Sequence, residues 1–319
     1  MKAAIYDQPG EPSVLHLAEV PDPRLAEDEI LIRVKAISIE GGDIVNRKAT
    51  VRSGPDDVLG YGAAGEVLKV GKAVEGFEIG QKVSTFSFTG SHAELRAAPA
   101  ATSWVIPDGL DIKVAAAIPT GPGTAALALK LGGLKKGETV LVLGAAGGVG
   151  IAAVQLAAKA GARVIGSGTN HETLQQLREY GLSDAIVSGH EPVSQQVREL
   201  LSGNGVDLLI DCVGGPALSD ALLALKDGGC AVLVGVFGGR NQPIDAGYLL
   251  FHRITVIGCM LGSIMGEADN RKMIADLLKQ AARGDLKVPI DATFALSDAA
   301  SAHQRAEERG RIGRVIMLP

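Results

Sequence analysis

Residues 139–162 read TVLVLGAAGGVGIAAVQLAAKAGA, and this stretch decides the fold. The apolar run 140–143 predicts a buried strand, and the glycine-rich segment 144–150 predicts a tight turn. The residues that follow repeat apolar side chains at helical spacing, and Gly161 stands where a glycine would end that helix. The stretch therefore predicts a strand, a turn and a helix, in the order that the dinucleotide-binding fingerprint requires.

Three positions in this turn carry the nucleotide interpretation. Ala145 replaces the first glycine of the fingerprint. Gly147 allows a pyrophosphate to approach the backbone, and Gly150 allows the helix to pack closely against the strand. The helix N-terminus offers N–H donors and the positive end of a dipole to phosphate. A glycine turn without any ligand is the alternative, but closely spaced glycines cost conformational entropy that a close approach would justify.

Composition limits the classes of protein to which the chain can belong. Its 319 residues suit two domains, and 46% hydrophobic with 21% charged residues predicts a sizeable core. A net charge of −5 without a Lys/Arg cluster argues against nucleic-acid or anionic-membrane partners. No run has the length of a membrane span or of a signal peptide. Scattered cysteines at 212, 230 and 259 predict no disulfide framework, and a cytoplasmic location is expected.

The two halves of the chain differ in their patterns. Residues 1–105 show short β-rich runs separated by Pro and Gly turns, which predicts a compact β-rich domain. From Val114 onward, strands alternate with helices, which predicts a doubly wound parallel sheet with its ligand at the carboxyl ends of the strands. The tail from Lys287 returns to short strands around one helix and is expected to fold back on the first domain.

Several further stretches carry a family resemblance. They are the D-x-x-x-R segment 43–47, VLGYGAAGEVLKVG at 58–71, GSHAEL at 90–95, PTGPGTAALAL at 119–129 and GRVI at 313–316. With the glycine turn, they resemble the zinc-independent quinone oxidoreductase (zeta-crystallin-like) branch of the medium-chain dehydrogenase/reductase superfamily, over nearly the whole chain.

The resemblance implies an α/β protein with a GroES-like catalytic domain at 1–119, completed by 287–319, and a Rossmann NADP(H)-binding domain at 120–286. It also implies NADPH as cofactor and a homodimer, often formed through an edge strand, here 255–260. The cofactor-binding residues that follow are Thr120, Thr124, Ala145, Ala146, Gly147, Gly148, Val149, Gly150, Ser167, Gly168, Thr169, Asn170, Val213, Gly235, Val236 and Phe237.

Departures from the family pattern concern the metal. Zinc alcohol dehydrogenases of this superfamily hold their catalytic metal with Cys, His and Cys, and the matching positions here are Glu40, Tyr61 and approximately Ala116. One carboxylate without N or S partners does not make a zinc site, so no metal is expected. The six histidines are scattered without ligand spacing and are expected to be surface or capping residues.

The candidate catalytic residues are Tyr61, Glu40 and Arg47. Tyr61 lies in an apolar, glycine-rich run, where a phenol suits polarisation of a substrate oxygen, although a core tyrosine bonded to backbone is equally consistent. Arg47 could instead pair with Asp43 as a structural brace. Glu40, beside two glycines, could equally be a solvated turn residue.

The end of the second Rossmann strand bears on cofactor choice. NAD-selective folds place an acidic residue there, whereas this chain has Ser167-Gly168-Thr169-Asn170, which predicts a preference for NADPH. Thr173 stands where the family often has Lys, so positive charge would have to come from Arg178 or Arg240.

The sequence thus predicts a zinc-independent, NADPH-dependent oxidoreductase that transfers hydride to a quinone or an α,β-unsaturated carbonyl compound bound between the domains. Ala126 stands where relatives carry an aromatic ring and predicts room for a bulky acceptor. The alternatives are a carbonyl or alcohol oxidoreductase that uses the same cofactor, and a non-catalytic NADPH-binding protein that senses redox state.

Overall fold

The computed structural model describes residues 1–54 and 56–319. The chain divides into two compact units. The first comprises residues 1–123, 261–308 and 313–319, and the second comprises residues 124–260 and 309–312. Among the described residues, none of the helices combines the length and the apolar character that crossing a membrane requires.

The second unit is built on a parallel sheet, which in the part of the chain that the structure describes has six strands in the order β10-β9-β8-β11-β12-β13. This is the strand order of a dinucleotide-binding fold, so the predicted Rossmann domain is confirmed. The strands are β8 (Thr139–Leu143), β9 (Arg163–Gly168), β10 (Asp184–Val187), β11 (Val206–Asp211), β12 (Leu225–Leu233) and β13 (Thr255–Gly258).

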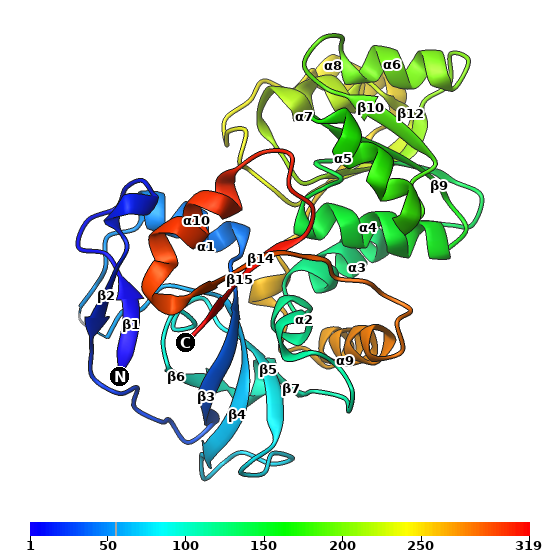
Figure 1. Ribbon diagram of the computed structural model, residues 1–319. Helices are drawn as coiled ribbons and strands as arrows, with labels where there is room; N and C mark the ends of the chain where they lie inside the picture. Colours follow the sequence, from blue (N-terminus) through cyan, green and yellow to red (C-terminus); the bar gives the residue numbers. More distant parts are fainter. Residues whose placement is uncertain (55) are drawn as a thin grey trace. The chain divides into compact units, whose positions relative to one another are not determined.

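Helices cover both faces of this sheet, α4 on one and α6 and α7 on the other (Figure 1). Val193 and Val197 of α6 and Leu218 and Leu222 of α7 join the apolar core of the sheet. Because both faces are covered, the strands are apolar almost throughout. The helices of this unit are α4 (Gly148–Lys159), α5 (His171–Gln176), α6 (Val193–Leu200), α7 (Gly215–Leu222) and α8 (Ala246–His252), and α3 (Gly121–Leu131) runs into the unit from the first.

The first unit is β-rich, as predicted. Its main sheet runs β14-β15-β3-β4-β5-β7, with β6 paired to β3, and a separate ribbon joins β1 to β2. The strands are β1 (Lys2–Ile5), β2 (His16–Glu19), β3 (Glu29–Ser38), β4 (Gly62–Val70), β5 (Lys82–Phe86), β6 (Leu95–Pro99), β7 (Ser103–Val105), β14 (Ile290–Ala295) and β15 (Arg314–Leu318).

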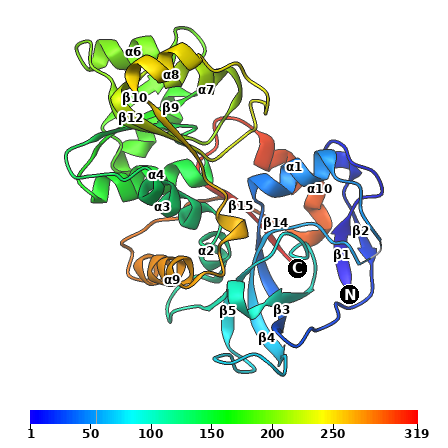
Figure 2. The same cartoon turned by 180° about the vertical axis from the view of Figure 1, so that it is seen from behind.

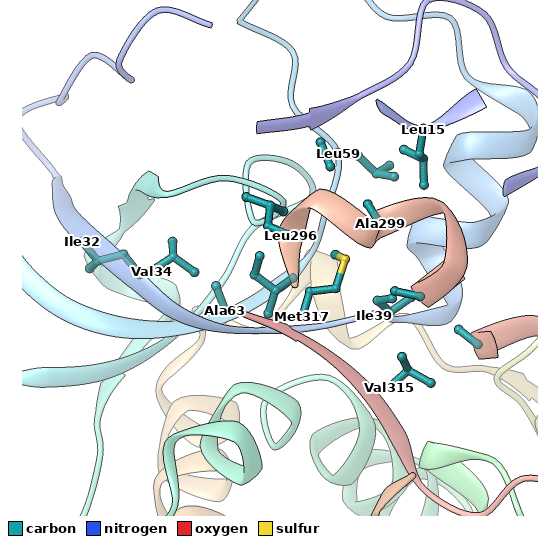
Figure 3. Packing of buried hydrophobic residues seen from close by; sticks show 14 of the residues in the cluster. Leu15, Ile32, Val34, Ile39, Leu59, Ala63, Leu296, Ala299, Val315 and Met317 are labelled. Carbon is teal, nitrogen blue, oxygen red and sulfur yellow. The ribbon is translucent and has the colours of Figure 1, made fainter. Parts of the chain in front are cut away.

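Helix α10 closes the core of this unit. Leu296, Ala299 and Met317 belong to the same apolar cluster as Ile32 and Leu59, so the C-terminal tail completes the core of the N-terminal strands (Figure 3). Figure 2 shows α10 beside α1. The helices of the unit are α1 (Gly41–Ala49), α2 (Ile112–Ala117), α9 (Ala268–Ala282) and α10 (Ala299–Glu307).

The boundaries of the two units differ from the predicted domains in three places. Residues 120–123, and residues 261–286, which contain α9, belong to the first unit rather than to the Rossmann domain. Arg271 of α9 donates to the carbonyl oxygen of Ala100 (2.9 Å), and its own carbonyl oxygen accepts from Trp104 Nε1 (3.0 Å). Residues 309–312 belong to the second unit, because Thr173 Oγ1 donates to Gly310 O (3.0 Å).

Candidate functional site

The carboxyl ends of the Rossmann strands meet in one row. Leu143 at the end of β8 is in register with Ser167 of β9 on one side and with Asp211 of β11 on the other. Asp211 is in turn in register with Leu233 of β12. The loops that follow these residues therefore emerge at the same edge, where the strand order reverses between β8 and β11 and where such sheets bind ligands.

The glycine turn after β8 has the geometry of a phosphate cradle. Gly144 has φ +69°, a left-handed conformation that favours glycine. A Cβ on Gly150 would collide with Gly144 O, so a glycine is required for α4 to approach the strand. Gly147 is the N-cap of α4. The N–H groups of Gly148 and Val149 lie in the first helical turn, where an α-helix provides no partner of its own.

Ala145, which replaces the first glycine of the fingerprint, is accommodated in the turn without a clash. Its side chain is fully buried, and its N–H donates to Ser167 O (3.0 Å). A Cβ on Gly166 of β9 would lie only 2.9 Å from the Ala145 methyl. The glycine in the neighbouring strand thus makes room for the methyl group, which is packed against β9.

Two further glycine-rich loops, which follow β11 and β12, lie at this edge. The sequence analysis predicted only some of their residues as cofactor-binding. Asp211 is fully buried, and its carboxylate accepts from the N–H groups of Val213 and Gly214, each at 2.9 Å. Gly238 N–H donates to Val213 O (2.8 Å). A Cβ on Gly235 would collide with Cys212 O, so the two loops lie backbone to backbone. The repeated Gly-Gly pairs at 214–215 and 238–239 were the signal for this packing.

The end of β9 differs in detail from the prediction. Ser167 is only 3% exposed, whereas Thr169 and Asn170 are exposed. Asn170 Oδ1 accepts from Thr173 N–H (2.8 Å) and caps α5. Arg178 donates to Gln175 and Ser183 and is held along its own helix.

A segment from a distant part of the chain, which carries two arginines, lies beside this corner. Thr173 Oγ1 donates to Gly310 O, and a Cβ on Gly310 would lie 3.4 Å from Asn170 Nδ2. The segment 309–312 therefore brings Arg309 and Arg311 beside the end of β9. Sequence reasoning missed both arginines because they lie about 140 positions from Asn170.

A further candidate cofactor residue, Thr120, directly precedes α3. Its Oγ1 is buried and has no hydrogen-bond partner among the described residues. A buried hydroxyl without a partner is costly unless a ligand supplies one. Thr124 lies on α3 and is partly buried. The unpaired hydroxyl of Thr120 lies in the first unit and the glycine turn at Gly147 in the second, and each taken by itself fits a polar group of a dinucleotide.

In the first unit, Tyr61 stands in an aromatic cluster. Its ring meets those of Phe86 and Phe88 edge to face, with centroids 5.6 and 5.5 Å away. Asn46 Nδ2 donates to Tyr61 Oη (3.3 Å). A Cβ on Gly42 would overlap the ring, so α1 presents bare backbone at 42 and an amide one turn later at 46. Tyr61 is half-buried, and the hydrogen bond to Asn46 leaves its own proton free to be donated.

Buried charged groups hold the backbone of this cluster. Arg96 Nη2 donates to the carbonyl oxygens of Tyr61 (2.8 Å) and Thr89 (2.9 Å). Tyr61 N–H donates to Asp43 Oδ1 (3.0 Å). Burial raises the pKa of Asp43 to about 8, and burial together with the nearby Asp43 also raises the pKa of Tyr61. Tyr61 therefore stays protonated at neutral pH, as a hydrogen-bond donor must.

Glu40 is not the solvated turn residue that the sequence left open. It is 1% exposed and is the N-cap of α1. Ser38 Oγ donates to its Oε1 (2.7 Å), and its Oε2 forms an ion pair with Arg314 Nη1 (2.7 Å). β15 runs antiparallel to β3 and thereby brings Arg314, which lies 274 positions away in sequence, to Glu40.

Arg47 does not form the brace with Asp43 that the sequence left open. Its guanidinium is fully buried and binds Gly10 O (3.1 Å), His303 Nδ1 (3.1 Å) and Glu307. Arg47 therefore links α1 to α10. These contacts account for its guanidinium without a substrate, which weakens its candidacy as a catalytic residue.

The expectation of surface histidines is wrong for two of the six. His92 and His303 are both fully buried, and their Nε2 atoms lie 2.9 Å apart. Burial lowers the pKa of His92 to about 3 and holds that of His303 well below its usual value. They are neutral links in a hydrogen-bonded chain from Ser91 to Arg47.

The residues at the superfamily's metal-ligand positions do not fit zinc. Glu40 is engaged by Ser38 and Arg314, and Ala116 has no donor side chain. Over the described residues, no three His, Cys, Asp or Glu side chains come together as a metal site would need. The absence of zinc itself stays a prediction.

Comparison with known proteins identifies the family to which the chain belongs. Residues 26–108 match the family described as alcohol dehydrogenase GroES-like domain, and residues 148–280 match the family described as zinc-binding dehydrogenase. A quinone oxidoreductase of Pseudomonas aeruginosa is 30% identical over 97% of each chain. The chain belongs to the medium-chain dehydrogenase/reductase superfamily, in its quinone oxidoreductase branch. It is therefore an oxidoreductase.

Other members of this superfamily show how wide the similarity is. An acryloyl-coenzyme A reductase of Sulfurisphaera tokodaii is 28% identical over 100% of both chains. The crystal structure of Escherichia coli quinone oxidoreductase complexed with NADPH matches with a TM-score of 0.92 and 26% identity, over 100% of both chains.

Proposed function

We propose that this member of the superfamily is a zinc-independent, NADPH-dependent reductase of quinones or α,β-unsaturated carbonyl compounds. The observation that carries the proposal is the single edge of the Rossmann sheet at which the glycine cradle, Val213 and Gly235 converge. NADPH, when bound, supplies the hydride. The protein binds and orients the reactants and provides hydrogen-bond donors to the acceptor oxygen.

The preference for NADPH is supported by charge at the end of β9. The described loop carries no carboxylate at 167–170 that would repel a 2′-phosphate, and Arg309 and Arg311 lie beside Asn170 and Thr173. The Escherichia coli relative was crystallised with NADPH. Together these observations favour the phosphorylated dinucleotide.

The acceptor class is supported by the names of the relatives and by the aromatic cluster. The relatives include quinone oxidoreductases and acryloyl-coenzyme A reductases. Tyr61 offers a phenolic donor on a wall made of Phe86 and Phe88, and Phe88 is 41% exposed. A wall of this kind suits a flat, conjugated acceptor with a carbonyl oxygen.

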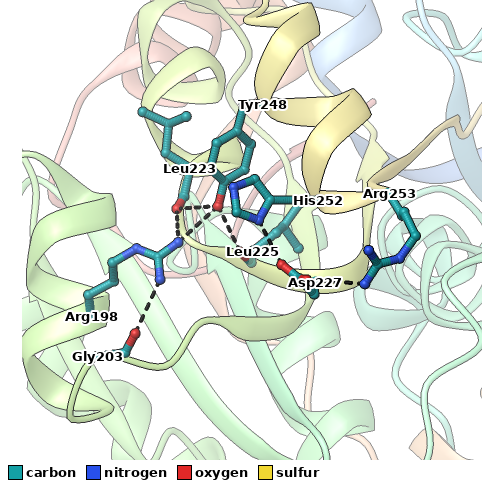
Figure 4. Close-up of polar contacts among 8 residues, drawn as sticks. All are labelled: Arg198, Gly203, Leu223, Leu225, Asp227, Tyr248, His252 and Arg253. Carbon is teal, nitrogen blue, oxygen red and sulfur yellow. Dashed lines mark hydrogen bonds and ion pairs between the residues drawn. The ribbon is translucent and has the colours of Figure 1, made fainter.

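A homodimer and a cytoplasmic location are also proposed. β13 is an edge strand, and α8, which leads into it, exposes Leu250 by 72% and Phe251 by 77%. Figure 4 shows that Tyr248, on the same helix, donates to Leu223 O and Leu225 O and so anchors α8. A rigid helix with exposed apolar side chains beside a free edge suits a second copy of the chain. The described cysteines are free thiols, as a reducing compartment would keep them.

A panel of quinones, enones, enals, simple aldehydes and alcohols, followed at the nicotinamide absorbance with NADPH and NADH, tests the proposal. We expect turnover of quinones or enones with NADPH, unchanged by a chelator, and no stoichiometric zinc in the purified protein. Turnover confined to simple aldehydes or alcohols would instead support a carbonyl or alcohol oxidoreductase. Tight NADPH binding without any turnover would indicate a redox-sensing binding protein.

Two variants test the cofactor assignment. Ser167→Asp places a carboxylate at the end of β9 and should reverse the NADPH/NADH preference. Arg309→Ala should weaken NADPH binding about tenfold, the value of one charge-assisted hydrogen bond of roughly 1.4 kcal/mol, and leave NADH binding unchanged. Arg283→Ala, at an exposed arginine of the first unit, is the control. An unchanged NADPH/NADH ratio in both variants would refute the assignment.

A further inference from the structure

The positions that correspond to the superfamily's metal ligands come together in the first unit. A Cβ on Gly62, the residue after Tyr61, would lie 2.9 Å from Ala116 O and 3.7 Å from Glu40 Oε1. The chain therefore keeps the spatial arrangement of the three positions although it has lost the ligand chemistry. What stands there is a buried ion pair between Glu40 and Arg314.

Arg314 is paired incompletely. It is 7% exposed, and its Nη1 meets Glu40 Oε2 at 2.7 Å. Its Nε and Nη2 are buried and have no hydrogen-bond partner among the described residues. Unpaired donors on a buried charged group cost free energy, because they give up their hydrogen bonds to water and gain none in return. A group from outside the chain would recover that cost.

The other buried arginines of this unit show that the fold can provide hydrogen-bond partners for nearly all the nitrogens of a buried guanidinium. Arg47 binds a carbonyl oxygen, an imidazole and a carboxylate with its three nitrogens. Arg96 binds the carbonyl oxygens of Tyr61, Thr85, Ser87 and Thr89, and only its Nε lacks a partner. Arg314 is thus the one of the three that leaves two of its nitrogens to a ligand.

We propose that the guanidinium of Arg314 takes the place of the superfamily's metal and binds the oxygen of the acceptor through Nε and Nη2. The inference rests on the proposed function. When hydride adds to the β carbon of a conjugated C=C–C=O system, the C=C electron pair forms a new C=C bond next to the carbonyl carbon and the C=O electron pair moves onto the acceptor oxygen, which becomes an enolate; a quinone that accepts hydride in this way then tautomerises to the quinol. Arg314 stabilises that charge, and a proton from Tyr61 or from water then neutralises it.

Helix α1 connects the two proposed donors. Glu40, the N-cap of α1, holds Arg314, and Gly42 in the first turn lies against the ring of Tyr61. Glu40 accepts from Ser38 as well, so it is fixed as an orienting partner and Arg314 keeps one direction for its remaining donors. Hydrogen-bond donors that are held in place before the charge develops are the usual requirement for this form of catalysis.

Arg314→Gln tests the role directly. We expect kcat and kcat/KM on the best acceptor to fall together by about 10² to 10³, with NADPH affinity within twofold of the wild type. Because removal of Arg314 alone leaves the buried carboxylate of Glu40 without its ion-pair partner, the double variant Glu40→Gln with Arg314→Gln is made in parallel and should fold with the same loss of turnover. Arg33→Gln, at an exposed arginine of β3, is the matched control and should keep full activity.

A binding measurement separates this inference from the proposed function. 4-Nitrophenol absorbs differently as phenol and as phenolate, and the wild type with Arg314 should bind it as the phenolate and lower its apparent pKa. The Arg314→Gln protein and the double variant should lose that shift, and dilute guanidinium should restore part of the turnover. Failure of the wild type on the whole acceptor panel would overturn the proposed function. Full turnover and an unchanged nitrophenol spectrum in both variants would overturn the role of Arg314 and leave the pair as a structural brace.

Discussion

At the residue scale, whether the hydroxyl of Tyr61 can donate a hydrogen bond to the acceptor depends on the direction of its O–H proton. Asn46 Nδ2 donates to Oη, so one lone pair is occupied and the O–H proton is available to an acceptor. The ring has little freedom, because Phe86 and Phe88 meet its edges and Gly42 lies beneath it. Asn46 therefore serves as a positioning residue for the proposed proton donor.

We predict that Asn46→Asp lowers kcat more than Asn46→Ala does. A carboxylate of the same shape would accept the phenolic proton and turn it away from the substrate, for an expected loss on the order of 10². Alanine removes only one hydrogen bond of about 1 kcal/mol, a roughly fivefold effect. Steady-state kinetics checks the order, with Asn204→Asp in the second unit as control. Equal or higher turnover in Asn46→Asp would contradict the assigned direction of the hydrogen bond.

At the element scale, the glycines of the turn between β8 and α4 are needed for different physical reasons. A Cβ on Gly150 would collide with Gly144 O, which is backbone and cannot move away. A Cβ on Gly147 would meet only Gly144 O, at 3.3 Å. Gly150 is thus required by the packing of helix on strand, whereas the approach of the ligand is the proposed reason for Gly147.

We expect Gly147→Ala to keep a melting temperature near that of the wild type and to raise the Kd for NADPH at least tenfold. Gly150→Ala should instead lower the melting temperature, because the clash distorts the turn itself. Thermal unfolding and fluorescence titration with NADPH give the two values for each variant. If Gly147→Ala binds NADPH as tightly as the wild type, the phosphates do not approach this residue.

At the scale of the whole molecule, buried neutral histidines tie stability to pH. Burial and the nearby cation Arg96 hold the pKa of His92 at about 3, and burial, His92 and Arg47 hold that of His303 well below 6.5. The unfolded chain takes up protons on both histidines below about pH 6.5, whereas the folded chain does not. Stability therefore falls as the pH falls, by up to about 1.4 kcal/mol per pH unit for each histidine. Asp43, with its pKa raised to about 8, acts in the opposite sense between about pH 4 and 8.

His303→Gln should make this pH dependence shallower. The amide can accept from Arg47 and donate to His92, so the chain of hydrogen bonds survives without the titrating ring. Urea unfolding at pH 7 and pH 5, followed by the fluorescence of Trp104, the chain's single tryptophan and a buried one, reports on the first unit. The loss of stability between the two pH values should be smaller by up to about 2 kcal/mol in the variant, because the unfolded histidine takes up its proton only below about pH 6.5. Parallel losses would show that His303 does not titrate on unfolding.

The sequence by itself determined the fold class and the Rossmann edge. The run 140–150 has a local physical meaning, since an apolar strand, a left-handed glycine and a helix N-cap each depend on neighbouring residues. The strands that follow could be placed from their apolar pattern for the same reason. Resemblance then supplied the order of the two domains and the positions expected for cofactor and metal.

Only the tertiary structure decided which charged groups meet. Arg314 reaches Glu40, Arg47 reaches His303, and Arg309 and Arg311 reach the end of β9, each across more than 130 positions. Such pairs cannot be predicted from the local sequence pattern. They depend on which strands pair and on where the C-terminal tail folds back, and neither can be read from the spacing of the residues. The burial of His92 and His303 was missed for that reason, and the exchange of a metal site for a guanidinium became visible only when β15 had brought Arg314 beside Glu40.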